Sequence, residues 1–155
     1  MIIIGSDHAG IDLKDNIVKY LEKKRIEYLD IRKNCNQDGD DYSDVSLDLC
    51  NSVLKSNNNL GIIICGTGIG VCISCNKVNG IRAALCTDPY MAETARKHNK
   101  ANVLCLGSRL ECMKNEEYVE TIVQAFIDNF FEGGRHDRRV NKINELEKIN
   151  KEGGR

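Results

Sequence analysis

The stretch from Leu60 to Lys77, which reads LGIIICGTGIGVCISCNK, constrains the fold more than any other part of this chain. It opens on three consecutive isoleucines, a β-branched apolar run that suits a strand buried on both faces of a parallel sheet. The run ends at Cys65, and the glycines after it allow a sharp turn that brings backbone N–H groups close to a ligand. The pattern from Val71 to Asn76 is compatible with a helix. A strand, a glycine loop and a helix N-terminus together predict an anion site.

The glycines of this stretch are Gly66, Gly68 and Gly70, with the spacing G-x-G-x-G. This spacing matches neither the dinucleotide fingerprint G-x-G-x-x-G nor the P-loop, which needs a Lys and a Ser or Thr after its last glycine. Nucleotide binding is therefore not favoured. A tight turn whose glycines serve packing alone is the alternative. Cys65 favours a functional site, because it stands at the carboxyl end of the strand, where open α/β sheets bind their ligands.

Length and charge narrow the possible classes. The 155 residues fit one domain, and 22 basic residues nearly balance 23 acidic ones. Without a strong net charge, neither nucleic acid nor a membrane surface is an expected partner. The apolar run at the N-terminus is too short for a signal peptide or a membrane span. We therefore expect a cytoplasmic protein with a small partner.

Cysteine is unusually frequent, with eight residues at positions 35, 50, 65, 72, 75, 86, 105 and 112. Several of them fall inside apolar strand or helix patterns, so reduced, buried thiols are favoured over a disulfide scaffold. Cys72-x-x-Cys75 could be half of a zinc site or a redox pair, but no second C-x-x-C exists. We expect these two thiols to be protonated packing groups, and Cys65 to be a thiolate favoured by the N–H groups of the glycine loop.

Strand and helix patterns alternate along the whole chain. Asp88 and Pro89 supply a helix cap and a first helical residue, and Gly133-Gly134 is expected to stop a strongly amphipathic helix. An acidic loop over 37–44 is expected to end in another helix cap. Strands are predicted over 2–6, 25–31, 62–64, 80–86 and 103–106, and helices over 11–24, 44–56, 71–76, 88–98, 115–131 and 135–150. This alternation predicts an α/β fold, a three-layer α/β/α sandwich with about five parallel strands and a C-terminal helical tail.

Polar loops and the tail carry the other candidate sites. Asp7-His8, the loop after Cys65 and Thr87-Asp88 each follow a strand, so we expect them along one sheet edge. Arg135 and Arg139 lie four residues apart, and one helix face carrying both would form a phosphate clamp. The tail has a thin apolar stripe that suggests docking on a partner surface, formed by Val140, Ile143, Leu146 and Ile149.

The motifs of this chain resemble those of the type B ribose-5-phosphate isomerases and their relatives, the galactose-6-phosphate isomerase subunits. The resemblance covers nearly the whole chain, with the motifs in order and at matching separations. They are Ser6-Asp7-His8-Ala9-Gly10, Asp41-Tyr42, Cys65-Gly66-Thr67-Gly68-Ile69-Gly70, Asn76-Lys77, Gly80-Ile81-Arg82-Ala83, His98-Asn99 and Glu132-Gly133-Gly134-Arg135-His136. The resemblance implies a Rossmann-like fold, a homodimer or dimer of dimers with active sites shared across the interface, and no metal or organic cofactor.

The resemblance also implies catalytic roles. Cys65 resembles the base that moves a proton between C1 and C2, and Thr67 is its neighbour in the site. His98 resembles the residue that opens the furanose ring, and Asp7 stands at a matching sugar-contact position. One branch of the family lacks the cysteine and has a glutamate six residues further along. That position is Val71 here, so this sequence resembles the cysteine branch.

Binding roles follow in the same way. The backbone cradle for the enediolate oxygen corresponds to Gly66, Gly68, Ile69 and Gly70. Tyr42 and Asn99 fall at further contact positions. The phosphate ligands, some of them given by the second subunit, correspond to His8, Arg109, Arg135 and Arg139.

The sequence is thus interpreted as that of an isomerase that interconverts ribose 5-phosphate and ribulose 5-phosphate through a cis-enediolate. An isomerase of a six-carbon sugar phosphate, of the galactose 6-phosphate or allose 6-phosphate type, is the alternative enzyme. A sugar-phosphate or nucleotide binding module without turnover, and a metal or redox protein built on Cys72 and Cys75, are alternatives from other classes. The tail over 135–150 is expected at the dimer interface.

Overall fold

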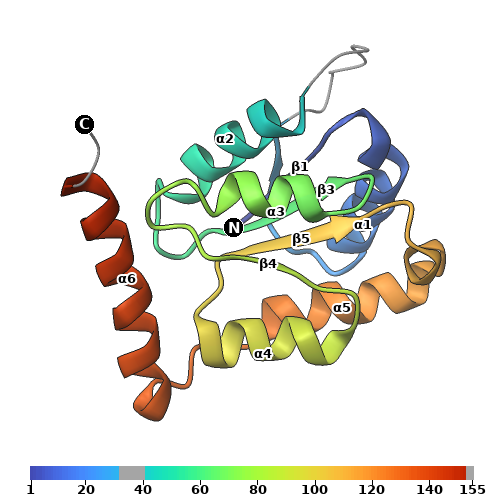
Figure 1. Ribbon diagram of the computed structural model, residues 1–155. Helices are drawn as coiled ribbons and strands as arrows, with labels where there is room; N and C mark the ends of the chain where they lie inside the picture. The colour runs from blue at the N-terminus through green and yellow to red at the C-terminus, as the bar shows by residue number, and fades with distance from the viewer. Residues whose placement is uncertain (32–40, 153–155) are drawn as a thin grey trace.

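The structure, a computed structural model, describes residues 1–31 and 41–152. In that part of the chain one sheet of five parallel strands has the order β2-β1-β3-β5-β4, which confirms the expected parallel sheet. The central strand β3 lies between β1 and β5 (Figure 1). The strands are β1 Ile2–Ser6, β2 Tyr28–Asp30, β3 Leu60–Cys65, β4 Ala83–Leu85 and β5 Val103–Gly107.

Helices cover both faces of the sheet. Helices α2 and α3 lie on one face, whereas α1, α4 and α5 lie on the other (Figure 1). The three-layer α/β/α sandwich is therefore confirmed. The helices are α1 Ile11–Lys23, α2 Tyr42–Val53, α3 Ile69–Cys75, α4 Pro89–Asn99, α5 Glu116–Asp128 and α6 Asp137–Glu152, with short 3₁₀ turns η1 His8–Gly10, η2 Glu111–Lys114 and η3 Gly134–His136.

Strand β3 is buried on both faces, as its isoleucine run predicts. Ile62 and Ile64 pack into the core beneath α1 and α5, while Ile63 and Cys65 pack into the core beneath α2 and α3. The three isoleucines are completely buried, and each contributes roughly 2 kcal/mol of hydrophobic stabilisation. The alternation also decides that the Cys65 side chain belongs to the α2 and α3 side.

Two predicted strands are shorter in the structure. The strand expected over 25–31 is limited to β2, because Arg25 has a left-handed φ of 57° and its N–H donates to Glu22 O at 3.0 Å, closing the end of α1. The strand expected over 80–86 is limited to β4. The side chain of Asn102 accepts from Arg82 N at 2.8 Å and donates to Gly80 O at 2.9 Å, so these two backbone groups bond a side chain and not a neighbouring strand.

Several helix boundaries also differ from the prediction, and α2 and α5 show the reasons. Helix α2 begins at Tyr42 with Asp41 as its N-cap, so the loop predicted to run through Asp44 ends earlier, and residues 37–40 of it lie outside the described residues. Helix α5 ends at Asp128 because Asn129 is extended and its Nδ2 donates to the carbonyl of Ala125 at 2.7 Å. The Gly133-Gly134 pair therefore does not stop this helix. The cap at Asp88 is confirmed, since its carboxylate accepts from Met91 N at 2.9 Å.

Helix α6 stands apart from the three layers at the edge where the strands begin (Figure 1). Only the first residue of its predicted stripe, Val140, is buried; Ile143, Leu146 and Ile149 are exposed. Glu147 ties the helix to the body by accepting from Gly80 N at 3.0 Å. The stripe is therefore open along α6.

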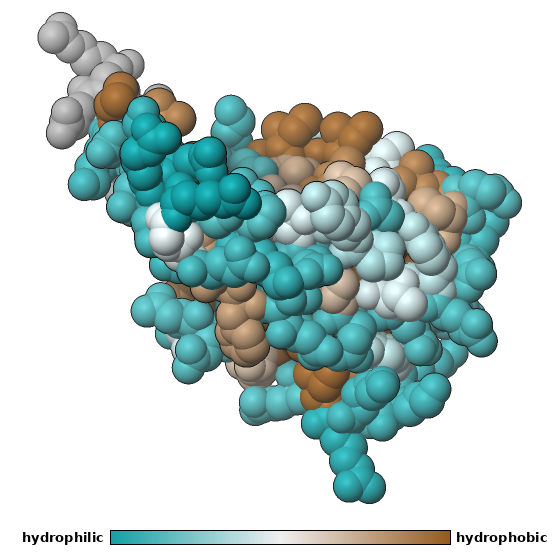
Figure 2. Space-filling model, turned by 90° about the horizontal axis from the view of Figure 1, so that it is seen from below, coloured by the Kyte–Doolittle hydropathy of each residue, from teal (hydrophilic) through white to brown (hydrophobic). Residues whose placement is uncertain are grey.

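The surface over α4 and α5 has a different character. Figure 2 shows it mostly hydrophilic, with apolar residues in small separate groups. Within residues 1–31 and 41–152, no helix has both the length and the apolar character required to cross a membrane.

A buried ion pair joins α1 to the end of β2 and generates a test of the fold. Lys14 Nζ lies 2.5 Å from Asp30 Oδ2, and each side chain is only 6% exposed. Burial acts to lower the pKa of Lys14, but hydrogen bonds and charges from Asp30 and Asp15 outweigh it and raise the pKa above 10.5.

We expect Lys14→Met to lower the free energy of unfolding by about 3 kcal/mol, because it removes the ammonium group that pairs with the buried Asp30 carboxylate. Lys19→Met, on the exposed side of the same helix, is the control and should change it by less than about 0.5 kcal/mol. Because the pKa of Lys14 is higher in the folded than in the unfolded state, the ion pair stabilises the fold fully below the unfolded-state pKa, and this stabilisation is lost as the pH rises through the folded-state pKa. The difference in unfolding free energy between wild type and Lys14→Met should therefore persist at neutral pH and shrink above pH 10.5. Urea denaturation measures both, and equal losses in the two variants would contradict the assignment.

Candidate active site

The candidate site is built around the turn that follows β3. Cys65, the last residue of the strand, is 4% exposed, and its Sγ accepts a hydrogen bond from Gly68 N at 3.1 Å. The turn is possible because Gly68 adopts a left-handed conformation with φ of 77°, which L side chains rarely adopt. Thr67 is exposed, and its hydroxyl accepts from Ile69 N at 3.3 Å. The turn therefore presents a thiol, a hydroxyl and backbone N–H groups together.

Neighbouring strands fix the position of this turn. A Cβ atom built on Gly68 would lie 2.5 Å from Leu85 Cδ1, at the end of β4. A Cβ atom built on Gly107, the last residue of β5, would lie 2.4 Å from the carbonyl oxygen of Thr67. Ser108 N also donates to Cys65 O at 2.9 Å. Because Gly68 and Gly107 have no side chain, the loop backbone can lie this close to the ends of β4 and β5, and these strands hold the loop in place.

The loop after β1 joins the same edge, as predicted. Asp7 N donates to Ile64 O at 3.1 Å, and the Asp7 carboxylate accepts from Ala9 N at 2.9 Å. Asp7 is buried at 7% exposure, whereas His8 is exposed. Sequence reasoning missed Ser108, whose hydroxyl donates to Ala9 O at 2.7 Å and links this turn to the end of β5.

Two predicted contact residues complete this group. The Tyr42 ring lies over Gly70, where an added Cβ would come within 3.0 Å of the ring. Arg109 lies beside Gly66, where an added Cβ would come within 3.3 Å of its Nε, and Arg109 N donates to Gly66 O at 2.9 Å. The structure thus brings together at one edge Asp7, His8, Tyr42, Cys65, Thr67, Arg109 and the loop Gly66 to Gly70. We call these residues the carboxyl-edge group.

The other predicted residues lie at the opposite edge of the sheet. Helix α4 runs back from the end of β4 to the start of β5 and is about 16 Å long, so His98 and Asn99 at its end lie near the start of the strands. Arg135 and Arg139 come later in the chain and lie at this same edge. They do not share one helix face as predicted, because Arg135 belongs to η3 and Arg139 to α6. We call these four residues the amino-edge group. Within one chain, the two groups do not meet.

Beside the amino-edge group, and sharing His98 with it, lies a cluster that sequence reasoning did not assign. The rings of His98 and His136 stack with centroids 4.1 Å apart and planes 10° from parallel. Glu132 Oε2 lies 4.0 Å from His98 Nε2. One ligand atom from each of these three residues lies within 4.8 Å of the others, which is a donor set that could hold a metal ion. The ammonium group of Lys97 lies 4.0 Å from the Glu132 carboxylate, and its positive charge would repel a metal cation bound at this position.

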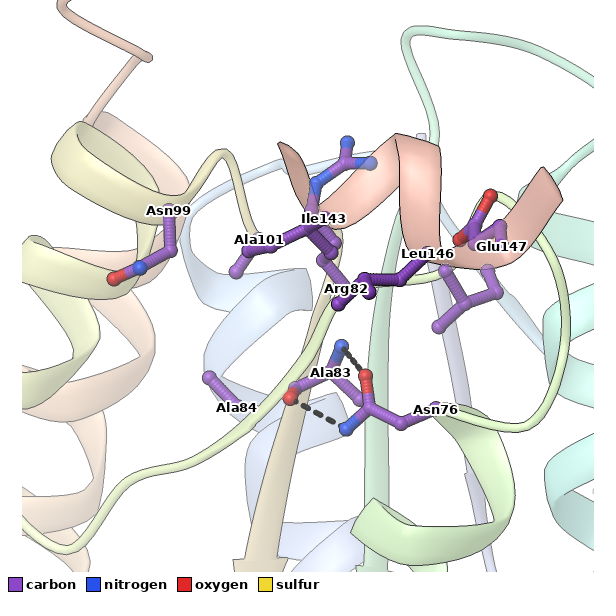
Figure 3. Close-up of a pocket in the computed structure, with 10 residues that line it drawn as sticks. Asn76, Arg82, Ala83, Ala84, Asn99, Ala101, Ile143, Leu146 and Glu147 are labelled. Atoms are coloured by element: carbon purple, nitrogen blue, oxygen red, sulfur yellow. Dashed lines mark hydrogen bonds between the residues drawn. The ribbon is translucent and has the colours of Figure 1, made fainter. Parts of the chain in front are cut away.

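A pocket of about 410 Å³ separates α6 from the body beside this group. Figure 3 shows Ile143, Leu146 and Glu147 on the α6 side, facing Arg82 and neighbouring residues on the body side. Asn76 closes the floor by two hydrogen bonds of 2.9 Å to the backbone of Ala83. The pocket therefore has a mostly apolar wall that α6 supplies.

The cysteines that follow the loop behave only partly as predicted. Cys75 is fully buried, which fits a packing role. Cys72 is half-buried, and a hydrogen bond with Cys105 lowers the pKa of Cys72 to about 7, while hydrogen bonds with Cys105 and Cys50 also lower the pKa of Cys75. Both shifts run against the expectation that these two thiols are protonated, although Cys72 Sγ donates to Ala83 O at 3.6 Å, as a thiol does. The pKa of Cys105 is raised by the contact with Cys72, by Cys75 and by burial. All seven described cysteines are free thiols.

The fold and site together define a class. This is a doubly wound α/β protein whose thiol, glycine loop and polar side chains gather at the carboxyl edge of the sheet, where such folds bind small ligands. Residues 2–143 match the sequence model of the family described as Ribose/Galactose Isomerase. The chain belongs to this family of enzymes, which confirms the resemblance of its motifs.

Individual relatives of this chain are also named as sugar-phosphate isomerases. A probable ribose-5-phosphate isomerase B of Mycoplasma pneumoniae is 45% identical over 142 residues, covering 92% of this chain and 91% of the relative. The D-erythrulose-4-phosphate isomerase of Pectobacterium atrosepticum is 43% identical with the same coverage. The structure of ribose-5-phosphate isomerase B from Mycoplasma genitalium with bound ribulose-5-phosphate has a TM-score of 0.87 and 43% identity, covering 95% of each chain.

The tight packing of the turn after β3 generates a prediction. Gly68→Ala should lower the free energy of unfolding by about 3 kcal/mol, because the new methyl group clashes with Leu85 and Leu106 and the backbone is left-handed. Gly134→Ala is a matched control, since Gly134 has a φ of 58° but no atom within 4 Å of the added Cβ. It should cost only about 1 kcal/mol of backbone strain. Chemical denaturation of both variants measures the difference, and equal costs would show that neighbouring strands do not hold the loop.

Proposed function

We propose that this chain is an aldose–ketose isomerase that interconverts ribose 5-phosphate and ribulose 5-phosphate. The observation that carries the proposal is the Cys65 thiol at the carboxyl edge, with the N–H of Gly68 donating to its sulfur inside a glycine loop. The similarity over 95% of the chain to an isomerase solved with ribulose-5-phosphate supports the pentose substrate.

Cys65 is the base of the proposed reaction. Its thiolate removes the proton from C2 of the open-chain aldose, and negative charge moves onto O1 in a cis-enediolate. Transfer of the O2 proton to O1 and return of the first proton to C1 give the ketose. The sugar C–H is a weak acid, so the charge on oxygen needs N–H donors. The loop from Gly66 to Gly70 offers them, at about 3 kcal/mol for each well-aimed donor.

The remaining roles fall to both groups of residues. His98 is the proposed acid that opens the furanose ring, and Arg135 and Arg139 bind the phosphate together with His8 and Arg109. Because the amino-edge group lies at the other end of the sheet from Cys65, one chain cannot supply a complete site. We infer that a second copy of the chain supplies the amino-edge group, which makes the active enzyme a homodimer or a pair of dimers.

Exposed apolar residues support this assembly. Ile69 and Ile73 on α3 are 53% and 58% exposed, next to the carboxyl-edge group. On α6, Ile143 and Leu146 line the pocket next to the amino-edge group. Contact between these surfaces in two copies would bury apolar area and bring Cys65 of one copy toward His98 of the other. The open stripe of α6 is thus a proposed part of the interface.

A six-carbon sugar phosphate is the second candidate substrate, favoured by the family's description, which includes galactose. One relative of 43% identity is named for a four-carbon sugar phosphate, so relatives at this level of identity are named for sugars with different numbers of carbon atoms. A panel of four-, five- and six-carbon aldose phosphates, ranked by kcat/KM, decides among them. A highest value for ribose 5-phosphate is the expected result.

Cys65→Ala should lower kcat for ribose 5-phosphate by about 10³-fold or more, because it removes the base while sparing the phosphate contacts. Cys72→Ala is the matched control, since Cys72 is a half-buried thiol with a pKa lowered to about 7 by Cys105 but has no place in the proposed reaction. It should retain activity. Ketose formation by absorbance measures both variants. Full activity in Cys65→Ala would refute the cysteine base, and loss in Cys72→Ala would point to a redox role.

A mixing experiment tests the shared site. Cys65→Ala and His98→Ala chains should each be inactive alone, but dissociation and reassociation of the mixture should restore about a quarter of wild-type activity. The reason is that half of the dimers are then hybrids, and each hybrid has one site in which both groups are intact. Activity assays before and after reassociation give the result. A mixture that forms dimers by sedimentation yet stays inactive would show that the two groups act within separate sites.

A further inference from the structure

His136 occupies a central place among the groups at the amino edge. It is 5% exposed, and its ring stacks on His98 at 4.1 Å between centroids, with planes 10° from parallel. Its backbone N–H donates to Gly133 O at 3.1 Å. The ring that faces His98 is thus held from the backbone side as well as by burial.

The same imidazole also contacts the arginine beside it. Arg135 Nε donates to His136 Nε2 at 3.2 Å. A nitrogen that accepts carries no proton, so the neutral ring has its proton on Nδ1. Burial, and then the charges of His98, Arg135 and Arg139, lower the pKa of His136, which keeps the ring neutral and able to accept.

We propose that His136 is a positioning residue that holds the ring-opening His98 through its face and the phosphate-binding Arg135 through its edge. The inference rests on the proposed function, because it gives those two residues their roles in the reaction. One imidazole then sets the distance between the group that acts on the sugar ring and the group that binds the phosphate.

The geometry favours positioning over metal binding by the same side chains. His136 Nε2 already accepts from Arg135, so its lone pair is not directed at a metal ion. Glu132 lies 4.0 Å from both Lys97 Nζ and His98 Nε2 and is placed among cationic or donor groups. The cluster is arranged as a chain from Arg135 through His136 and His98 to Glu132.

Two substitutions separate the two contacts. His136→Phe keeps a flat ring for the stack on His98 but removes the acceptor for Arg135. His136→Gln keeps an acceptor that can reach Arg135 but removes the ring. If His136 only fills space, the two variants should have the same kinetic defect.

Ribulose 5-phosphate gives a readout free of ring opening, because its 5-hydroxyl is phosphorylated and it cannot close to a furanose. Deuterium exchange at its C1 in heavy water, followed by NMR, reports proton transfer alone. We expect His136→Gln to lower kcat/KM for ribose 5-phosphate about tenfold and to change this exchange less than about twofold. We expect His136→Phe to raise KM for both sugar phosphates about tenfold with kcat nearly unchanged, as loss of a phosphate contact does.

Equal defects in the two variants, or wild-type kinetics in both, would overturn the proposal. A wild-type enzyme without activity on ribose 5-phosphate would instead refute the proposed function, so the two failures are distinguishable. A measurement on the unsubstituted ring covers the case in which a variant fails to fold. The ¹⁵N shifts of His136 should show the proton on Nδ1, and an Nε2-protonated ring in the wild-type protein would equally overturn the proposal.

Discussion

The hydrogen bond from Gly68 N–H to the Cys65 sulfur is the interaction on which the site depends. It exists because the chain reverses in a left-handed turn directly after a fully buried strand. The turn leaves no room for a Cβ, since Leu85 and Leu106 press against Gly68. Strands β4 and β5 therefore position the thiol as much as its own strand does. The sheet holds the site in place, and the glycines of the loop allow residues of the neighbouring strands to pack directly against it.

The parallel topology has a second consequence. In a doubly wound sheet every helix returns the chain to the opposite edge, so residues at strand ends and residues at helix ends are separated by the length of a strand. The carboxyl-edge and amino-edge groups are separated in this way, and a second copy of the chain is the proposed solution. The left-handed Gly133 and Gly134 place η3 against the end of α4, so His98 and His136 can stack before any partner is present.

Much of the fold was predictable because local rules agree with it. The isoleucine run of β3, the cap at Asp88 and the helical spacing of α1 each follow from local chemistry, and the structure confirms them. Prediction failed where a side chain, distant in the chain or next to the helix end, replaced a regular backbone bond. Asn102 shortened β4, and the side chain of Asn129 closed α5 ahead of the glycines. The carboxyl-edge group was predictable because parallel strands end at one edge.

The sequence by itself determined the alternation of strands and helices and the glycine turn after Cys65, because these depend on residues close together in the chain. It also determined the family, through motifs that follow one another in order along nearly the whole chain. Only the tertiary structure decided which groups touch across long separations. The lowered pKa of Cys72 depends on Cys105 in β5, and the place of His136 depends on the end of α4. Such contacts join elements that the sheet and its connections bring together, and no local spacing encodes the distance between them.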